Sequence, residues 1–120
     1  MARKTPETCT RKTIDLSEAE YMPNDACKEM ISELSKGLAH PSRVEIVRIL
    51  ATKPKEERCI CGDIVSALPL AQSSVSQHLK VLKETGWIYG EIEGPSTCYC
   101  LVDGILELYQ RLVRKILEMG

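Results

Sequence analysis

The sequence predicts a mainly α-helical domain that carries one small β-hairpin. Apolar residues recur at helical spacing in several segments, and proline or glycine separates these segments. Two short runs rich in β-branched and aromatic residues flank the turn-forming residues 93–96, which predicts a hairpin. The length of 120 residues, of which 43% are hydrophobic and 28% charged, suits one domain with one modest core.

The N-terminal part of the chain divides into a tail and a first helix. Residues 1–20 are polar and lack an apolar period, so we expect a flexible N-terminal tail followed by a folded domain over 21–120. Apolar positions then recur at helical spacing from Pro23 to Leu38, which predicts a first helix with Asn24 or Asp25 as its cap.

Two further helices are expected in the middle of the chain. Pro41 suits the first turn of a second helix. A charged connector over residues 53–57 follows it, and the apolar pattern then predicts a short helix over about 60–68 that ends at Pro69.

The remaining elements are a helix, the hairpin and a last helix. The segment Ala71–Glu84 reads as a helix that Thr85-Gly86 closes as a glycine C-cap. Trp87–Ile92 and Thr97–Val102 are the expected strands, and Asp103–Met119 is the expected last helix.

The order of these elements defines the expected architecture. Helix, helix, helix-turn-helix, hairpin and helix follow one another, which is the pattern of a winged helix-turn-helix with extra N- and C-terminal helices. Both end helices are apolar over a broad face that so small a domain cannot bury internally. We therefore expect these helices to form the seam of a homodimer.

Composition and charge exclude several function classes. No apolar run approaches the roughly 20 residues that span a membrane, and no signal-peptide pattern follows Met1, so a cytoplasmic protein is expected. The sequence lacks a glycine-rich phosphate loop and a plausible carboxylate pair, and therefore offers no support for an enzyme. The net charge of −1 argues only mildly against a nucleic-acid partner. Phosphate binding needs a local basic stripe rather than a basic protein as a whole.

The segment Ala71–Glu84 has two different faces on a helical wheel. Val75, Leu79 and Leu82 share the apolar face. The opposite face carries small polar side chains and one cation, namely Ser73, Ser76, Gln77 and Lys80. Such side chains can bond base edges and phosphates when a helix lies in the DNA major groove.

Two alternative interpretations of this polar face compete with DNA binding. An isolated stripe of this kind is more often a solvated helix face. Its position in the second helix of a helix-turn-helix, directly before a hairpin, favours DNA recognition. A pure protein-interaction module would leave the polar face without a role.

Three stretches carry a family resemblance. Leu38–Arg43, Leu70–Leu82 and Gly86–Ile88 resemble the ArsR/SmtB family of metal(loid)-responsive winged-helix repressors. The resemblance implies a homodimer that binds a palindromic operator in double-stranded DNA and leaves it when an inducer binds. The DNA contacts that it implies are Ser73, Ser74, Ser76, Gln77, His78 and Lys80. The hairpin turn departs from the family pattern because it lacks the basic residues of many wings.

Cysteine is unusually frequent in this chain. The six cysteines are Cys9, Cys27, Cys59, Cys61, Cys98 and Cys100, and four of them form two Cys-x-Cys pairs. Without an export signal, we expect reduced thiols used for metal binding or redox sensing rather than a disulfide framework.

The first pair, Cys59 and Cys61, looks like the Cys-x-Cys element that starts the third helix in the family. Thiolates suit trivalent arsenic or antimony, cadmium and lead, so such an ion is the expected inducer, with arsenic first. Some relatives place a third cysteine where this chain has Ile64. The resemblance therefore implies that Cys9 or Cys27, reaching from the other subunit, completes the site. A zinc site on the last helix is rejected, because no histidine follows His78.

The second pair, Cys98 and Cys100, lies on a predicted strand, where residues i and i+2 face the same side about 6–7 Å apart. This pair is a secondary hypothesis for a metal site. A thiol-based redox or persulfide sensor of the same fold remains the alternative function, because the same cysteines can form a reversible disulfide.

Overall fold

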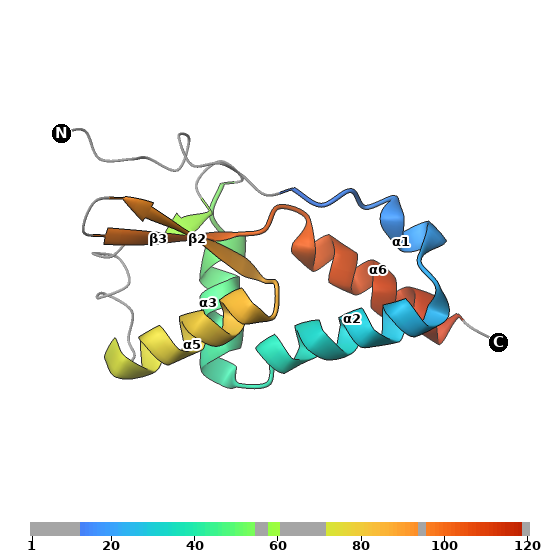
Figure 1. Ribbon diagram of the computed structural model, residues 1–120, viewed down its shortest axis with the longest axis horizontal. Coiled ribbons are helices and arrows are strands. Elements are labelled where there is room, and N and C mark those ends of the chain that lie inside the picture. The colour runs from blue at the N-terminus through green and yellow to red at the C-terminus, as the bar shows by residue number, and fades with distance from the viewer. Residues whose placement is uncertain (1–12, 55–57, 61–71, 94–95, 119–120) are drawn as a thin grey trace.

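The computed structural model describes residues 13–54, 58–60, 72–93 and 96–118 (Figure 1). The described residues of its N-terminal and central parts contain the helices α1 Glu18–Tyr21, α2 Asn24–Gly37, α3 Pro41–Ala51 and α5 Gln72–Glu84. The strands are β1 Cys59–Ile60, β2 Ile88–Glu93 and β3 Ser96–Leu101, and the last helix is α6 Ile105–Leu117. Within these residues, no helix has the length and apolar character needed to cross a membrane.

The three strands form one antiparallel sheet in the order β1-β3-β2. Strands β2 and β3 make the predicted hairpin, with Ile88 opposite Leu101 and Glu93 opposite Ser96. The short strand β1 pairs with the other edge of β3 and places Cys59 opposite Cys100.

Strand β1 corrects the prediction of a helix that begins near residue 60. Ile60 pairs with Tyr99 in the sheet and is fully buried. A short apolar run fits a buried strand as well as a buried helix, and its periodicity does not distinguish the two. The rest of the expected short helix, residues 61–68, lies outside the described residues.

The helix starts differ in how they are capped. Helix α2 begins at Asn24 with Pro23 at the N-cap, and no side chain caps it. The expected cap by Asn24 or Asp25 is therefore wrong. Helix α3 begins at Pro41 as predicted, and His40 Nδ1 accepts a hydrogen bond from the Ser42 N–H at 3.0 Å. This bond satisfies one of the N–H groups that have no partner in the first turn of a helix.

Trp87, which directly precedes β2, contacts both α2 and α6. Its side chain is fully buried, and its indole Nε1–H donates a 2.7 Å hydrogen bond to the Leu34 carbonyl oxygen of α2. Its ring meets Tyr109 of α6 edge-on, with 5.4 Å between the centroids. A Cβ on Gly37 would lie 2.5 Å from the Trp87 ring, so the close approach of α2 to this ring requires glycine.

The residues before α2 pack along α6. The Ile14 N–H donates to the Asp103 carbonyl oxygen at 3.0 Å, and Ala19 of α1 is buried. The Lys115 ammonium donates to the carbonyl oxygens of Ala19 at 2.9 Å and Met22 at 2.7 Å. Within the range of the expected tail, Ile14 and Ala19 thus form hydrogen bonds to the folded domain, and residues 1–12 lie outside the described part.

Candidate nucleic-acid interface and thiol site

Helix α5 has the two faces that the sequence predicts. Val75, Leu79 and Leu82 are buried against the core. Most of the predicted DNA contacts are exposed, namely Ser74, Ser76, Gln77 and Lys80. Ser73 belongs to α5, but its side chain lies outside the described part of the molecule. The exposed face therefore offers small polar groups and one cation to a partner.

The C-terminal end of α5 is closed by glycine as predicted. Gly86 has a φ of 96°, a left-handed conformation that glycine adopts without a Cβ penalty. The Trp87 N–H donates to the Leu82 carbonyl oxygen at 3.0 Å, which is the long bond of a Schellman motif. This motif turns the chain from α5 directly into β2.

His78 belongs to α5, and its half-buried side chain contacts α3. The Arg43 guanidinium Nη1 lies 3.3 Å from His78 Nδ1, and because a guanidinium only donates, the imidazole nitrogen accepts. The His40 ring packs 4.5 Å from the His78 ring. Burial, together with the charges of His40 and Arg43, lowers the pKa of His78. The neutral imidazole of His78 is thus part of the packing between α3 and α5.

Arg43 extends this contact to α2. Its Nε donates to the Gly37 carbonyl oxygen at 2.8 Å, and its Nη2 donates to the Lys36 carbonyl oxygen at 3.3 Å. These carbonyls belong to the last turn of α2, where a cation is electrostatically favourable. One side chain therefore ties α2, α3 and α5 together. The sequence did not predict this positioning role of Arg43, because its contact with His78 joins residues 35 positions apart in the chain.

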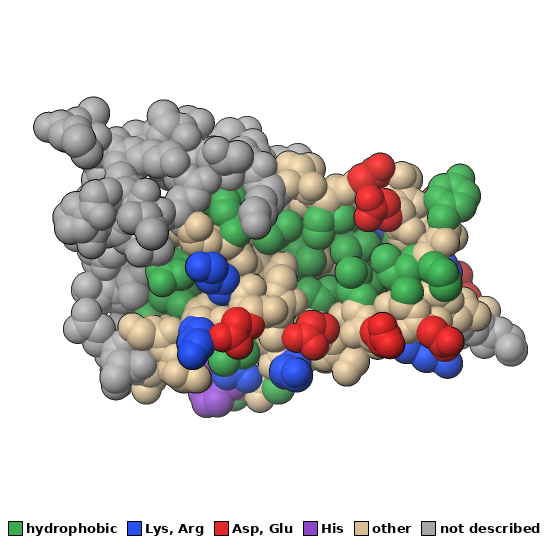
Figure 2. Space-filling view, in the orientation of Figure 1, with side chains coloured by type: hydrophobic (Ala, Val, Ile, Leu, Met, Phe, Trp, Pro, Cys, Tyr) green, Lys and Arg blue, Asp and Glu red, His purple; other side chains and the backbone are tan. Residues whose placement is uncertain are grey.

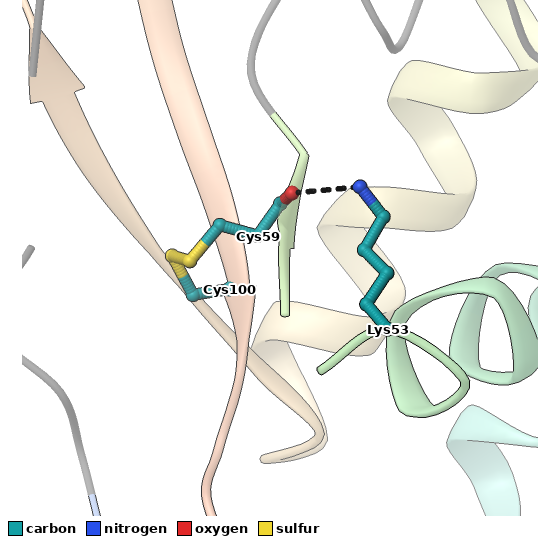
Figure 3. Close-up of a disulfide and its surroundings, with 3 residues drawn as sticks. All are labelled: Lys53, Cys59 and Cys100. Carbon is teal, nitrogen blue, oxygen red and sulfur yellow. Dashed lines mark hydrogen bonds between the residues drawn. A yellow bond between two sulfur atoms is a disulfide. The ribbon is translucent and has the colours of Figure 1, made fainter. Parts of the chain in front are cut away.

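A disulfide links Cys59 of β1 to Cys100 of β3 (Figure 3). The two Cα atoms are 3.9 Å apart, and the side chains are 8% and 1% exposed. Cys98 is also buried and disulfide-bonded. The expectation of reduced thiols is therefore wrong for these three cysteines. For Cys59 and Cys100 the cause is strand pairing, which brings together one member of each Cys-x-Cys pair.

The other predicted ligands are not brought to this pair within the described chain. Cys27 is a free thiol in the first turn of α2, fully buried, with its Sγ 3.7 Å from the Met22 carbonyl oxygen. That turn lies at the end of the molecule away from β1 (Figure 1). Cys9 and Cys61 lie outside the described residues. Across the part that is described, no three potential ligands gather at one point.

Helix α6 carries a shallow groove on its outer side. Its volume is about 470 Å³, and it is lined by Tyr109, Gln110, Val113, Arg114 and Leu117. Leu117 is 79% exposed. Figure 2 shows hydrophobic side chains gathered over the part of the molecule that α2 and α6 form, beside a row of acidic side chains.

Comparison with known proteins matches the region that contains α3, α5 and the start of the hairpin. Residues 40–89 match the family described as "Bacterial regulatory protein, arsR family". An uncharacterised HTH-type transcriptional regulator of Methanocaldococcus jannaschii is 30% identical over 88 residues, which cover 73% of this chain and 96% of that protein. The chain belongs to the ArsR/SmtB family. Because this is a family of transcriptional regulators, the expectation that the chain is not an enzyme is confirmed.

Other members of the ArsR/SmtB family extend the comparison. The HTH-type transcriptional repressor SmtB of Mycobacterium tuberculosis is 42% identical over 71 residues, or 59% of this chain, and the match spans 50% of that protein. This chain thus covers about half the length of that relative. A transcriptional repressor SmtB homolog of Synechocystis is 28% identical over 102 residues, 84% of this chain and 74% of that protein.

A solved structure supports the fold. The crystal structure of an ArsR family transcriptional regulator matches with a TM-score of 0.57 and 17% identity, over 76% of this chain and 87% of that one. The predicted winged helix-turn-helix is therefore confirmed.

Proposed function

We propose that this chain is a cytoplasmic, DNA-binding transcriptional repressor that lays α5 in the major groove. The observation that carries the proposal is the exposed polar face of α5 above its buried apolar face. A helix so presented, followed at once by a hairpin, has the geometry of a recognition helix.

The residues of the α5 face divide by the contacts that they make. Gln77 bonds a base edge, and Lys80 bonds guanine or a phosphate. Ser73, Ser74 and Ser76 bond bases or phosphates. His78 is the weakest of the proposed contacts, because the Arg43 guanidinium already occupies one of its ring nitrogens.

We further propose that the repressor is a homodimer on a palindromic operator. The exposed Leu117, the groove beside it and the 37% exposed Met30 of α2 support a seam formed by the outer faces of α2 and α6. Two copies related by a two-fold axis present two α5 helices, and such an arrangement reads two half-sites of opposite orientation.

The proposed inducer is a thiophilic ion, first trivalent arsenic or antimony and next cadmium or lead. Membership in the ArsR/SmtB family and the density of cysteines support it. Thiolates bind such ions only in the reduced state. This proposal therefore requires that Cys59 be released from its disulfide and act with Cys61 and with Cys9 or Cys27.

A second candidate is a thiol-based redox or persulfide sensor of the same fold. The disulfide between Cys59 and Cys100 favours it, since this bond joins two cysteines that are far apart in the sequence but opposite each other in the sheet.

The DNA-binding proposal is tested with a duplex that the reduced protein selects from a random-sequence DNA pool. We expect Gln77→Ala and Lys80→Ala each to weaken binding by about 1–3 kcal/mol, or roughly tenfold to a hundredfold in Kd. Lys28→Ala removes one exposed charge from α2 and is the matched control. Unchanged binding by both α5 variants would overturn the proposed interface.

The inducer is tested by titrating this complex with arsenite, cadmium, zinc and polysulfide. Release by arsenite that is lost in Cys59→Ser and Cys61→Ser supports the metalloid site. Release by polysulfide alone supports the second candidate. If both of these serine variants respond like the wild type, the assignment of Cys59 and Cys61 to the inducer site is contradicted.

A further inference from the structure

Cys59 and Cys100 face each other at a position of the sheet that favours bond formation. The Leu101 N–H donates to the Arg58 carbonyl oxygen at 2.9 Å, directly beside the cysteine pair. Hydrogen-bonded and non-hydrogen-bonded pairs alternate in an antiparallel ladder, so Cys59 and Cys100 form a non-hydrogen-bonded pair, in which side chains lie closest. Their sulfurs can therefore join or separate without a change of strand register.

Strand β1 has anchors that do not depend on the disulfide. Ile60 is fully buried, and the Lys53 ammonium donates to the Cys59 carbonyl oxygen at 3.4 Å (Figure 3). The Arg58 Nε in turn donates to the Lys53 carbonyl oxygen at 3.2 Å. Because these contacts do not involve the sulfur atoms, we expect the fold of the domain to survive cleavage of the bond.

The disulfide closes a covalent ring of the chain that includes the proposed recognition helix α5. The two cysteines are 41 residues apart, and the intervening chain includes α5 and β2. Strand β1 precedes α5, while β2 follows it through Gly86 and pairs with β3. The bond therefore fixes β1, which precedes α5 in the chain, to β3, which pairs with the strand that follows α5.

We propose that Cys59 and Cys100 are a dithiol–disulfide pair through which a hydroperoxide controls DNA binding. The Cys59 thiolate, the more exposed of the two, attacks the peroxide oxygen, and the O–O bond breaks to give a sulfenic acid and an alcohol or water. The Cys100 thiol then attacks the Cys59 sulfur and displaces water. Two electrons pass from the two sulfurs to the peroxide, and the thiol protons leave in the products.

This inference rests on the proposed DNA-binding function and is tested on the full chain. The protein is reduced, freed of reductant, treated with hydrogen peroxide and mapped by alkylation and mass spectrometry, and its Kd for the selected duplex is measured in both states. We expect a Cys59–Cys100 link and a change in Kd of about fivefold or more, reversed by reductant. The wild type itself gives this result, so no variant has to fold.

Variants locate the response. Cys59→Ser and Cys100→Ser are expected to abolish the peroxide effect on Kd, whereas Cys27→Ser, which alters a buried thiol of α2, is expected to retain it. A response that survives Cys100→Ser, or a Cys59–Cys100 link that leaves Kd unchanged, would overturn this inference alone. Failure to select any duplex would overturn the proposed function and, with it, this coupling.

Discussion

The two ends of the molecule present opposite kinds of surface. The face of α5 exposes Ser74, Ser76, Gln77 and Lys80, all of them polar. The large apolar side chains of Tyr21 of α1, Met30 of α2 and Leu117 of α6 are exposed. Figure 2 shows hydrophobic side chains gathered over the end of the molecule that α2 and α6 form. A polar face can bind and release a charged, hydrated partner such as DNA, whereas an apolar face is stable only when it stays covered. The contrast supports the proposal that α5 binds DNA and that the apolar end forms the seam of the proposed dimer.

The two ends are also held together in different ways. Helix α5 is tied to α3 by the Arg43–His78 contact, which is half open to solvent. Trp87, which joins α2 and α6 to the hairpin, is fully buried. Polar contacts near the surface contribute less to stability than the burial of a large aromatic side chain. We therefore expect Trp87 to control the stability of the fold and the Arg43–His78 contact to adjust the position of α5.

The largest predicted effect follows from removing the buried joint. Trp87→Ala should lower the free energy of unfolding by about 3–5 kcal/mol, because it leaves a cavity and removes the hydrogen-bond donor of the Leu34 carbonyl. Chemical denaturation of the reduced protein measures this loss.

Trp87→Phe separates the two causes. It keeps an aromatic ring beside Tyr109 but removes the indole N–H, so its loss should be clearly smaller than that of Trp87→Ala. Equal losses in the two variants would contradict the view that packing, rather than the hydrogen bond, dominates at this joint.

A smaller effect is expected at the apolar end. Leu117→Glu should weaken the proposed dimer by about 1.5–3 kcal/mol per buried leucine while leaving the fold of the monomer intact, since Leu117 is 79% exposed. Analytical ultracentrifugation over a range of concentrations measures the dissociation constant. Glu107→Gln, at an exposed position in the first turn of α6, is the control. A wild-type chain that stays monomeric at every concentration would contradict the proposed seam.

The sequence predicts α5 well and the thiol site poorly, for a physical reason. The two faces of α5 depend on residues three or four apart, so local periodicity contains them. The pairing of Cys59 with Cys100 depends on which strand a two-residue segment joins, and no local pattern contains that choice. The role of Arg43 was missed for the same reason, because its partners lie on two other helices.

The smallest predicted effect concerns the polar joint and its dependence on pH. The pKa of His78 is lower in the folded protein than its ordinary value of 6.5, because burial and the nearby His40 and Arg43 disfavour the protonated ring. Above pH 6.5 the ring is neutral in both states and its full contribution to stability is present. As the pH falls below 6.5, the unfolded chain binds the proton more readily, so stability decreases until the pH passes the folded pKa.

The variant His78→Gln should lack the part of this decrease in stability that His78 causes. Denaturation midpoints of the two proteins between about pH 8 and pH 5 should therefore converge on acidification, and midpoints that stay parallel would show that His78 is not held neutral.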